Sequence, residues 1–173
     1  MTDRRFFRLL PFAVVLTLAL SACTVYVRPG SPGPTHVTVP LDNIITSFAP
    51  TRGAGAVYYV GETIQFRIRT NRSGYITLSA MDPDGRVYVL ARNIFVPAYQ
   101  TTILPTREMR VSFSAAPPTG LHRVRASFTP SRTNPGQAQY QGRNGLQSWS
   151  IAIDHDIGSY PVRDVADTTL TIR

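Results

Sequence analysis

The sequence predicts an all-β domain, an antiparallel immunoglobulin-like β-sandwich that follows an N-terminal signal and a Pro/Gly tether. Two observations favour strands over helices. Apolar residues recur with period two in short runs, and Gly, Pro, Asn and Asp separate these runs. Several such runs in a chain of 173 residues are typical of two packed antiparallel sheets.

The first 22 residues have the layout of a secretory signal. Arg4, Arg5 and Arg8 supply positive charge, and a short apolar run follows from Leu9 to Leu20. A membrane-spanning helix needs roughly 20 apolar residues. We therefore expect this segment, residues 1–22, to be cleaved as a signal peptide rather than retained in the membrane.

The signal ends in Leu20-Ser21-Ala22-Cys23, which resembles the lipobox of bacterial lipoproteins. The resemblance implies cleavage before Cys23, acylation of its thiol and a mature chain held at a membrane. The alternative is an ordinary signal peptide with an incidental cysteine. Because Cys23 is the only cysteine, no thiol then remains for a disulfide, a nucleophile or a zinc site. We expect an exported, lipid-anchored protein on the periplasmic face or the cell surface.

Residues 23–48 are expected to hold the lipidated cysteine and an extended tether, because the run 29–34, PGSPGP, resists both helix and packed strand. Residues 49–173 then form the sandwich. The predicted strands are, in order, 57–60, 63–70, 75–81, 86–91, 109–115, 121–128, 148–154 and 168–172, with parts of 36–48 as a weaker addition.

Alternation is clearest in the strand 63–70, where Ile64, Phe66 and Ile68 are apolar and the residues between them are polar. We expect one face of this strand to be buried and the other to face solvent. The connection 130–147 is long and polar, which is typical of a functional or mobile loop. It is either a surface hairpin tip or a contact for a partner.

The stretch Asp82-Pro83-Asp84-Gly85 has two interpretations. Alternate aspartates followed by glycine suggest a calcium loop, but Gly85 comes too early and two carboxylates cannot supply the six to eight oxygens that calcium takes. The residues fit a hairpin turn instead, because Pro83 fixes φ and Gly85 supplies a left-handed conformation. We predict a hairpin with a bulged three-residue loop.

Four motifs follow one another in the first half of the predicted domain. They are Tyr59-Val60-Gly61-Glu62-Thr63-Ile64-Gln65-Phe66, Ser73-Gly74-Tyr75-Ile76, Asp82-Pro83-Asp84-Gly85 and Leu90-Ala91-Arg92-Asn93. With these motifs the chain resembles the bacterial domain-of-unknown-function family 4384, over about a quarter of its length, from Val57 to Asn93. The resemblance implies an exported or envelope β-domain, and the family has no agreed catalytic residues to carry over. We find no family motif from Thr101 onward.

Two histidines are candidate metal ligands. His122 lies on the apolar side of its predicted strand, and His155 stands between Asp154 and Asp156. Imidazole with carboxylate suits copper or zinc, and copper superoxide dismutases use a β-sandwich. The sequence lacks the His-x-His pair and the disulfide that such a resemblance implies. An exported copper-dependent redox enzyme of superoxide dismutase type is therefore the alternative hypothesis, and no cofactor is the leading one.

Arginine provides the other candidate site. All 18 basic residues are arginine, against 10 acidic residues. Arginine binds phosphate and carboxylate in a bidentate manner, although a GC-rich coding sequence also replaces lysine by arginine. If their strands are neighbours, the arginines of 63–70 and 121–128 form a positive stripe; otherwise they are a scattered solvated surface. The candidate partner-binding residues are Arg67, Arg69, Arg72, Arg123, Arg125, Arg132, Tyr140 and Arg143.

No nucleophile motif such as G-x-S-x-G and no nucleotide-binding glycine loop is present in the sequence. The leading hypothesis is a non-enzymatic envelope lipoprotein that docks onto other envelope or surface-layer proteins, or onto anionic polymers. Nucleic acid is not an expected partner, because export places the domain outside the cytoplasm.

Overall fold

The computed structural model describes residues 39–136 and 140–173. The predicted signal peptide, Cys23 and most of the predicted tether lie outside the described residues. The elements are β1 (Ile45–Pro50), β2 (Ala56–Tyr58), β3 (Thr63–Ile64), β4 (Phe66–Thr70), β5 (Gly74–Met81), β6 (Val87–Val96), β7 (Thr101–Leu104), η1 (Arg107–Met109), β8 (Phe113–Ser114), β9 (Gly120–Thr129), α1 (Gly145–Ile157) and β10 (Asp164–Ile172).

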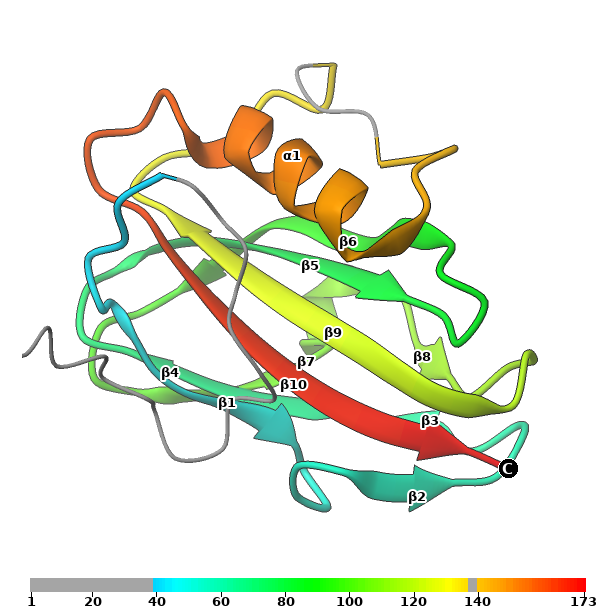
Figure 1. Cartoon of the computed structure of the whole chain (residues 1–173). Helices are drawn as coiled ribbons and strands as arrows, with labels where there is room; N and C mark the ends of the chain where they lie inside the picture. Colours follow the sequence, from blue (N-terminus) through cyan, green and yellow to red (C-terminus); the bar gives the residue numbers. More distant parts are fainter. Residues whose placement is uncertain (1–38, 137–139) are drawn as a thin grey trace, which may run out of the picture.

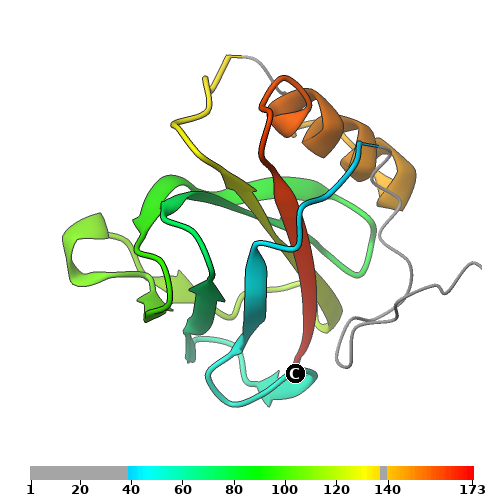
Figure 2. The same cartoon turned by 90° about the vertical axis from the view of Figure 1, so that its left-hand side faces the viewer.

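The strands form a sandwich. A five-stranded sheet has the order β2-β10-β9-β5-β6, a three-stranded sheet has the order β1-β4-β7, and β3 pairs with β8. Neighbouring strands are antiparallel except for the parallel pair β2 and β10. Figures 1 and 2 show the three-stranded sheet on one side of the five-stranded sheet and α1 on the other. The prediction of a mostly β, antiparallel sandwich is confirmed.

Two apolar cores follow from this layering. The larger core lies between the sheets and contains Phe66, Ile68, Leu78 and Phe128, all almost fully buried. The smaller core lies between α1 and the outer face of the five-stranded sheet, and Trp149 is its largest side chain. Both faces of the five-stranded sheet are therefore buried, at least in part.

The sandwich begins before residue 49. Strand β1 starts at Ile45, inside the range 23–48 assigned to the tether, and Ile44 and Ile45 are buried. The backbone N–H of Ile45 donates to the buried Asp164 carboxylate at 2.7 Å, which joins β1 to the start of β10. The structure therefore supports the weaker prediction, a strand within 36–48, over an extended tether that continues to residue 48.

The prediction of a strand at 148–154 is wrong, because these residues lie in α1. The apolar residues Trp149, Ile151 and Ile153 alternate, which favoured a strand. Trp149, Ile153 and Ile157 are also spaced by four, and a helix places such residues on one face. These three side chains are buried, whereas Ile151 is 41% exposed.

Other differences are smaller. The strand predicted at 109–115 is reduced to the two residues of β8, because η1 occupies Arg107–Met109. Strand β7 at Thr101–Leu104 was not predicted, although it completes the three-stranded sheet beside β4.

A buried arginine fixes α1 to the sheet. Arg125 of β9 is 1% exposed, and its Nε donates to Asp167 of β10 at 2.8 Å. Its Nη1 donates to Ser150 Oγ of α1 at 3.0 Å, and its guanidinium lies 4.3 Å from the centre of the Trp149 ring. Burial raises the pKa of Asp167, and the neighbouring Arg125 opposes that shift.

A second polar group lies beside the first. Arg92 Nη1 of β6 donates to both carboxylate oxygens of Asp156 at 2.9 Å, and the Tyr140 hydroxyl donates to Asp156 Oδ2 at 2.9 Å. Trp149 Nε1 also donates to Ser79 Oγ of β5 at 2.9 Å. The helix is thus held by hydrogen bonds to three neighbouring strands as well as by apolar packing.

Because α1 is a helix, two of its isoleucines should contribute very differently to the free energy of unfolding. Ile153→Ala should lower the free energy of unfolding by about 2–5 kcal/mol, because it leaves a cavity in the smaller core. Ile151→Ala, the matched control, should change it by about 0.5 kcal/mol or less, as for other surface substitutions. Denaturant unfolding measures both. Equal losses in the two variants would support an alternating strand and contradict the helix.

Candidate functional site

The turn between β5 and β6 has the predicted geometry. The backbone N–H of Gly85 donates to the carbonyl oxygen of Asp82 at 2.9 Å. The backbone N–H of Asp82 donates to the carbonyl oxygen of Arg86 at 3.0 Å. Gly85 has φ of 88°, in the left-handed region that favours glycine. The prediction of a hairpin with a bulged three-residue loop is confirmed.

The tip of this hairpin is attached to the segment that leads into α1. The backbone N–H of Gly145 donates to the carbonyl oxygen of Gly85 at 2.8 Å. The backbone N–H of Val87 donates to the carbonyl oxygen of Arg143 at 3.2 Å. A Cβ added at Gly85 would lie 2.5 Å from Asn144 Oδ1. The turn therefore also sets where the helix begins.

Asp82, the first residue of the turn, forms a buried polar cluster. Its Oδ1 lies 3.2 Å from His122 Nδ1, and His122 Nε2 lies 2.8 Å from the carbonyl oxygen of Pro118. Burial raises the pKa of Tyr88, and the charge and hydrogen bond of Asp82 raise it further, so Tyr88 stays neutral. Arg86 Nη2 is more distant, at 3.8 Å from Asp82 Oδ2.

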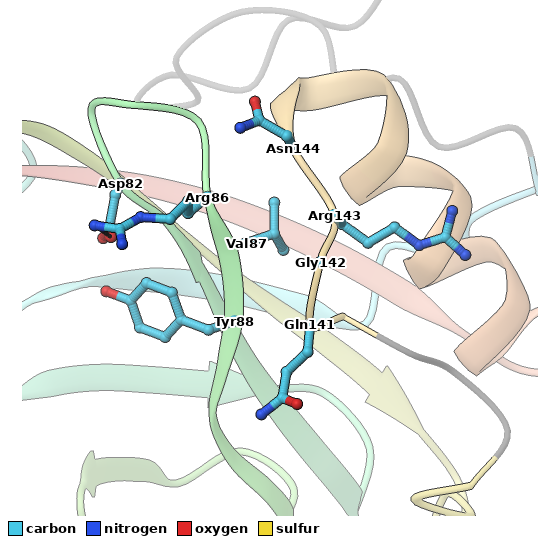
Figure 3. Close-up of a pocket in the computed structure, with 8 residues that line it drawn as sticks. All are labelled: Asp82, Arg86, Val87, Tyr88, Gln141, Gly142, Arg143 and Asn144. Carbon is cyan, nitrogen blue, oxygen red and sulfur yellow. Dashed lines mark ion pairs between the residues drawn. The ribbon is translucent and has the colours of Figure 1, made fainter.

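Two hollows share Asp82 and Tyr88. The first, which we call the hairpin pocket, has a volume of about 390 Å³ and lies between the hairpin and residues 141–144. Figure 3 shows Asp82, Arg86 and Tyr88 gathered on one side of the hairpin, whereas Arg143 points away from them toward α1. Arg86 Nε is paired with Asp84 at 2.9 Å.

The second hollow, which we call the inter-sheet cavity, has a volume of about 430 Å³. It lies between the β5–β6 hairpin, the pair β3–β8 and the ends of β9 and β10, and Asp82, Tyr88 and His122 contribute to its wall. Most of the remaining wall is apolar. This is the type of hollow that binds small molecules in other proteins.

The candidate metal ligands are not brought together. His122 is on the inner side of the five-stranded sheet, beside Val124 and the larger core. His155 is exposed on α1, which covers the opposite face of that sheet, and the nearby Asp156 is engaged by Arg92 and Tyr140. Asp154 is on the same helix and half-buried. Among residues 39–136 and 140–173, no group of three or more His, Cys, Asp or Glu side chains can hold a metal ion.

The structure separates the arginines that were expected to form one stripe. Arg67 and Arg69 are exposed on β4, in the three-stranded sheet. Arg123 and Arg125 are on β9, in the five-stranded sheet, on the face that α1 covers. The expectation that Arg125 faces solvent is therefore wrong: its role is to hold Asp167 and α1.

The other candidate partner-binding residues have varied surroundings. Arg72 is exposed in the turn between β4 and β5. Arg132 is exposed, and its guanidinium lies 5.6 Å from the centre of the Tyr75 ring. Tyr140 is buried against Asp156, which with burial raises the pKa of its hydroxyl. Arg143 is half-buried beside the hairpin pocket.

Sequence reasoning missed the cluster around Asp82. The turn motif explained both aspartates locally, so nothing linked Asp82 to His122, which is 40 residues away in the sequence. The signal that was present is the inward-facing His122, which needs polar partners in an apolar core. The ion pair of Arg92 with Asp156 was missed for a similar reason, because it joins β6 to α1, and Asp156 was considered only as a metal ligand.

Comparison with known protein families identifies part of the chain. Residues 57–132 match the family described as a domain of unknown function, DUF4384. The predicted resemblance is confirmed, and the match continues past Asn93 to Arg132, just beyond the end of β9, through residues in which we had found no family motif. Strand β1, helix α1 and strand β10 are outside the DUF4384 match. No curated protein matches the chain.

Within the part of the chain that the structure covers, no helix is both long and apolar enough to cross a membrane. The covering helix α1 has 13 residues and carries aspartates near its end.

The turn predicts the effect of one substitution. Gly85→Val should lower Tm by roughly 3 °C or more, because a left-handed valine costs about 1 kcal/mol or more and its Cβ meets Asn144. Asp84→Asn on the same exposed turn is the control and should change Tm by less than about 2 °C. Added calcium should change neither protein. A calcium-dependent rise in Tm that Asp84→Asn abolishes would support the metal loop instead.

Proposed function

We propose that this protein is a lipid-anchored component of the bacterial cell envelope. Its sandwich domain docks onto other envelope or surface-layer components without catalysing a reaction. The support for the anchor is the sequence alone, since the charged and apolar start of the chain ends at its single cysteine, Cys23. The support for docking comes from the distribution of charge over the folded domain.

Most carboxylates of the described residues are engaged by partners within the domain. Asp82, Asp156 and Asp167 are buried or nearly so, and each faces a histidine or an arginine. Glu62 pairs with Arg52 at 2.9 Å. Two others accept backbone hydrogen bonds, namely Asp42 from Arg163 N–H and Asp164 from Ile45 N–H. Few carboxylates are therefore left to compensate positive charge on the surface.

Several arginines are exposed and form no ion pair with any described residue. Arg67 and Arg69 carry the argument, because they lie side by side on the outer face of the three-stranded sheet. Their cross-strand neighbours are Ala49 and Ile103 for Arg67, and Ser47 and Thr101 for Arg69. No carboxylate stands among these neighbours. The others are Arg72, Arg107, Arg110 and Arg132.

This arrangement gives the outer face of the three-stranded sheet a positive charge on a rigid surface. We call it the β4 arginine face, defined by Arg67 and Arg69. Guanidinium groups bind phosphates and carboxylates with two parallel hydrogen bonds, so an anionic partner fits best. An anionic envelope polymer or an acidic surface protein has this chemistry. No observation in the folded domain favours the copper enzyme over this function.

The anchor is tested by fractionating cells that make the wild-type chain or Cys23→Ser. Removing the only thiol removes the acylation site, so the variant should leave the membrane fraction, because acyl chains supply the membrane affinity. A Cys23→Ser chain that stays fully membrane-bound would mean that the lipid is not the anchor.

Docking is tested in the same Cys23→Ser background by sedimentation with sheared envelope fragments. Arg67→Gln with Arg69→Gln should weaken binding roughly three- to tenfold, since exposed ion pairs each contribute below about 1 kcal/mol. Added salt should weaken the parent in the same way. Arg107→Gln with Arg110→Gln removes the same charge from the β7–β8 connection and should have a smaller effect. Equal losses in the two pairs would reject the β4 arginine face as the docking surface.

A further inference from the structure

The inter-sheet cavity is large enough for a ligand and has an apolar interior. Its volume of about 430 Å³ falls within the range of roughly 300–1,000 Å³ that small-molecule sites occupy. An apolar cavity of about 150 Å³ holds benzene, so two fused rings fit here. The buried apolar wall includes Ile64, Phe66, Ala80, Phe113, Val124 and Leu170.

The cavity reaches the surface on one side. Ser112, Ala116 and Pro117 belong to its wall and are exposed, so the residues on both sides of β8 form a rim. The opposite wall is the hairpin of β5 and β6, with Ala80 and Tyr88. A ligand therefore has a route from solvent to the interior without a rearrangement of either sheet.

The buried polar part of the wall is the pair Asp82 and His122, whereas Ser112 and Ser114 are exposed at the rim. Both ring nitrogens of His122 are already taken, by Asp82 and by the Pro118 carbonyl. Burial and then the charge of Asp82 raise the pKa of the Tyr88 hydroxyl, so Tyr88 stays neutral. A carboxylate has about four acceptor positions; Asp82 Oδ1 lies 3.2 Å from His122 Nδ1, and Oδ2 lies 3.8 Å from Arg86 Nη2, beyond hydrogen-bond distance. The Asp82 carboxylate thus retains acceptor capacity.

The charge of Asp82 limits which classes of ligand the cavity can bind. An anion would place its charge beside Asp82 in an apolar cavity, which is strongly unfavourable. A full positive charge would compete with Arg86, which lies 3.8 Å from Asp82, and would lose its hydration among apolar walls. A neutral hydroxyl or N–H group can donate to Asp82 without either cost.

We propose that the inter-sheet cavity binds a small neutral molecule with an apolar body of one or two rings and one hydrogen-bond donor, which donates to Asp82. This activity is separate from docking through the β4 arginine face, since the cavity and that face share no residue that carries either argument.

Three matched probes test the ligand class: 2-naphthol, naphthalene and 2-naphthoate. Each is titrated into the full chain carrying Cys23→Ser, with amide chemical shifts and calorimetry as readouts. We expect 2-naphthol to bind with one site per chain and to shift the amides of Asp82, Tyr88 and His122. Naphthalene should bind about fivefold more weakly, as the loss of one hydrogen bond implies, and 2-naphthoate should not bind.

Two pairs of variants locate the site. Ala116→Phe fills the exposed rim and should weaken 2-naphthol binding roughly tenfold or more, because the ring occupies the entrance. Val111→Phe is the control, since Val111 is exposed on the other side of β8, next to the rim residue Ser112, but is not part of the wall. Asp82→Asn should reduce the preference for 2-naphthol over naphthalene, whereas Asp84→Asn on the exposed turn should not.

Failure of 2-naphthol to bind, or binding that Ala116→Phe leaves unchanged, would overturn the proposal. Equal affinity for 2-naphthol and naphthalene, or a preference for 2-naphthoate, would overturn the role of Asp82 as acceptor. None of these results bears on sedimentation with envelope fragments, so the two proposals fail separately.

Discussion

The rest of the structure depends on the buried guanidinium of Arg125. A charged side chain under a helix is stable only if its charge is compensated and its donors are used. Asp167 supplies the compensating carboxylate, and Ser150 and Trp149 of α1 contribute a hydrogen bond and a ring face. These partners come from two elements, so the helix has one position over the sheet in which the charge is satisfied.

Because α1 covers the outer face of the five-stranded sheet, that face is not available to bind a partner. With α1 in place, Trp149 and its neighbours cover the outer face of the five-stranded sheet, and β9 offers no exposed basic stripe. The outer face of the three-stranded sheet remains open, with Arg67 and Arg69 on it. The internal pairs Arg92–Asp156 and Arg125–Asp167 each take up one arginine and one carboxylate. The excess of 18 basic over 10 acidic residues in the sequence is therefore not compensated by these pairs.

The sequence predicted the sandwich because β4, β5 and β9 show alternation or turn motifs that depend on local residues alone. The D-P-D-G turn was predicted for the same reason, since its geometry needs only Pro83 and Gly85. The helix was missed because Trp149, Ile151 and Ile153 satisfy both periodicities over a short window. That error had a consequence for the site, because Arg125 looks solvent-exposed only if nothing covers β9.

The contacts that sequence reasoning missed join residues far apart in the chain. Asp82 with His122 and Arg125 with Asp167 are pairs of this kind. No local pattern in the sequence indicates that either pair is in contact. The DUF4384 match ends before α1 and β10, so the partners of Arg125 are also outside the matched region. Only the packing of the elements brings these charges together.

The most direct measurement of this account is a double-mutant cycle at Arg125 and Asp167, followed by denaturant unfolding. Asp167→Leu alone leaves Arg125 uncompensated and should cost about 3–5 kcal/mol. Adding Arg125→Met should recover much of that loss, since an apolar pair of similar volume needs no compensation. This result would show that the buried Arg125 charge is tolerated beneath α1 because Asp167 compensates it. Additive losses, or a cost below about 1 kcal/mol for Asp167→Leu, would contradict the account.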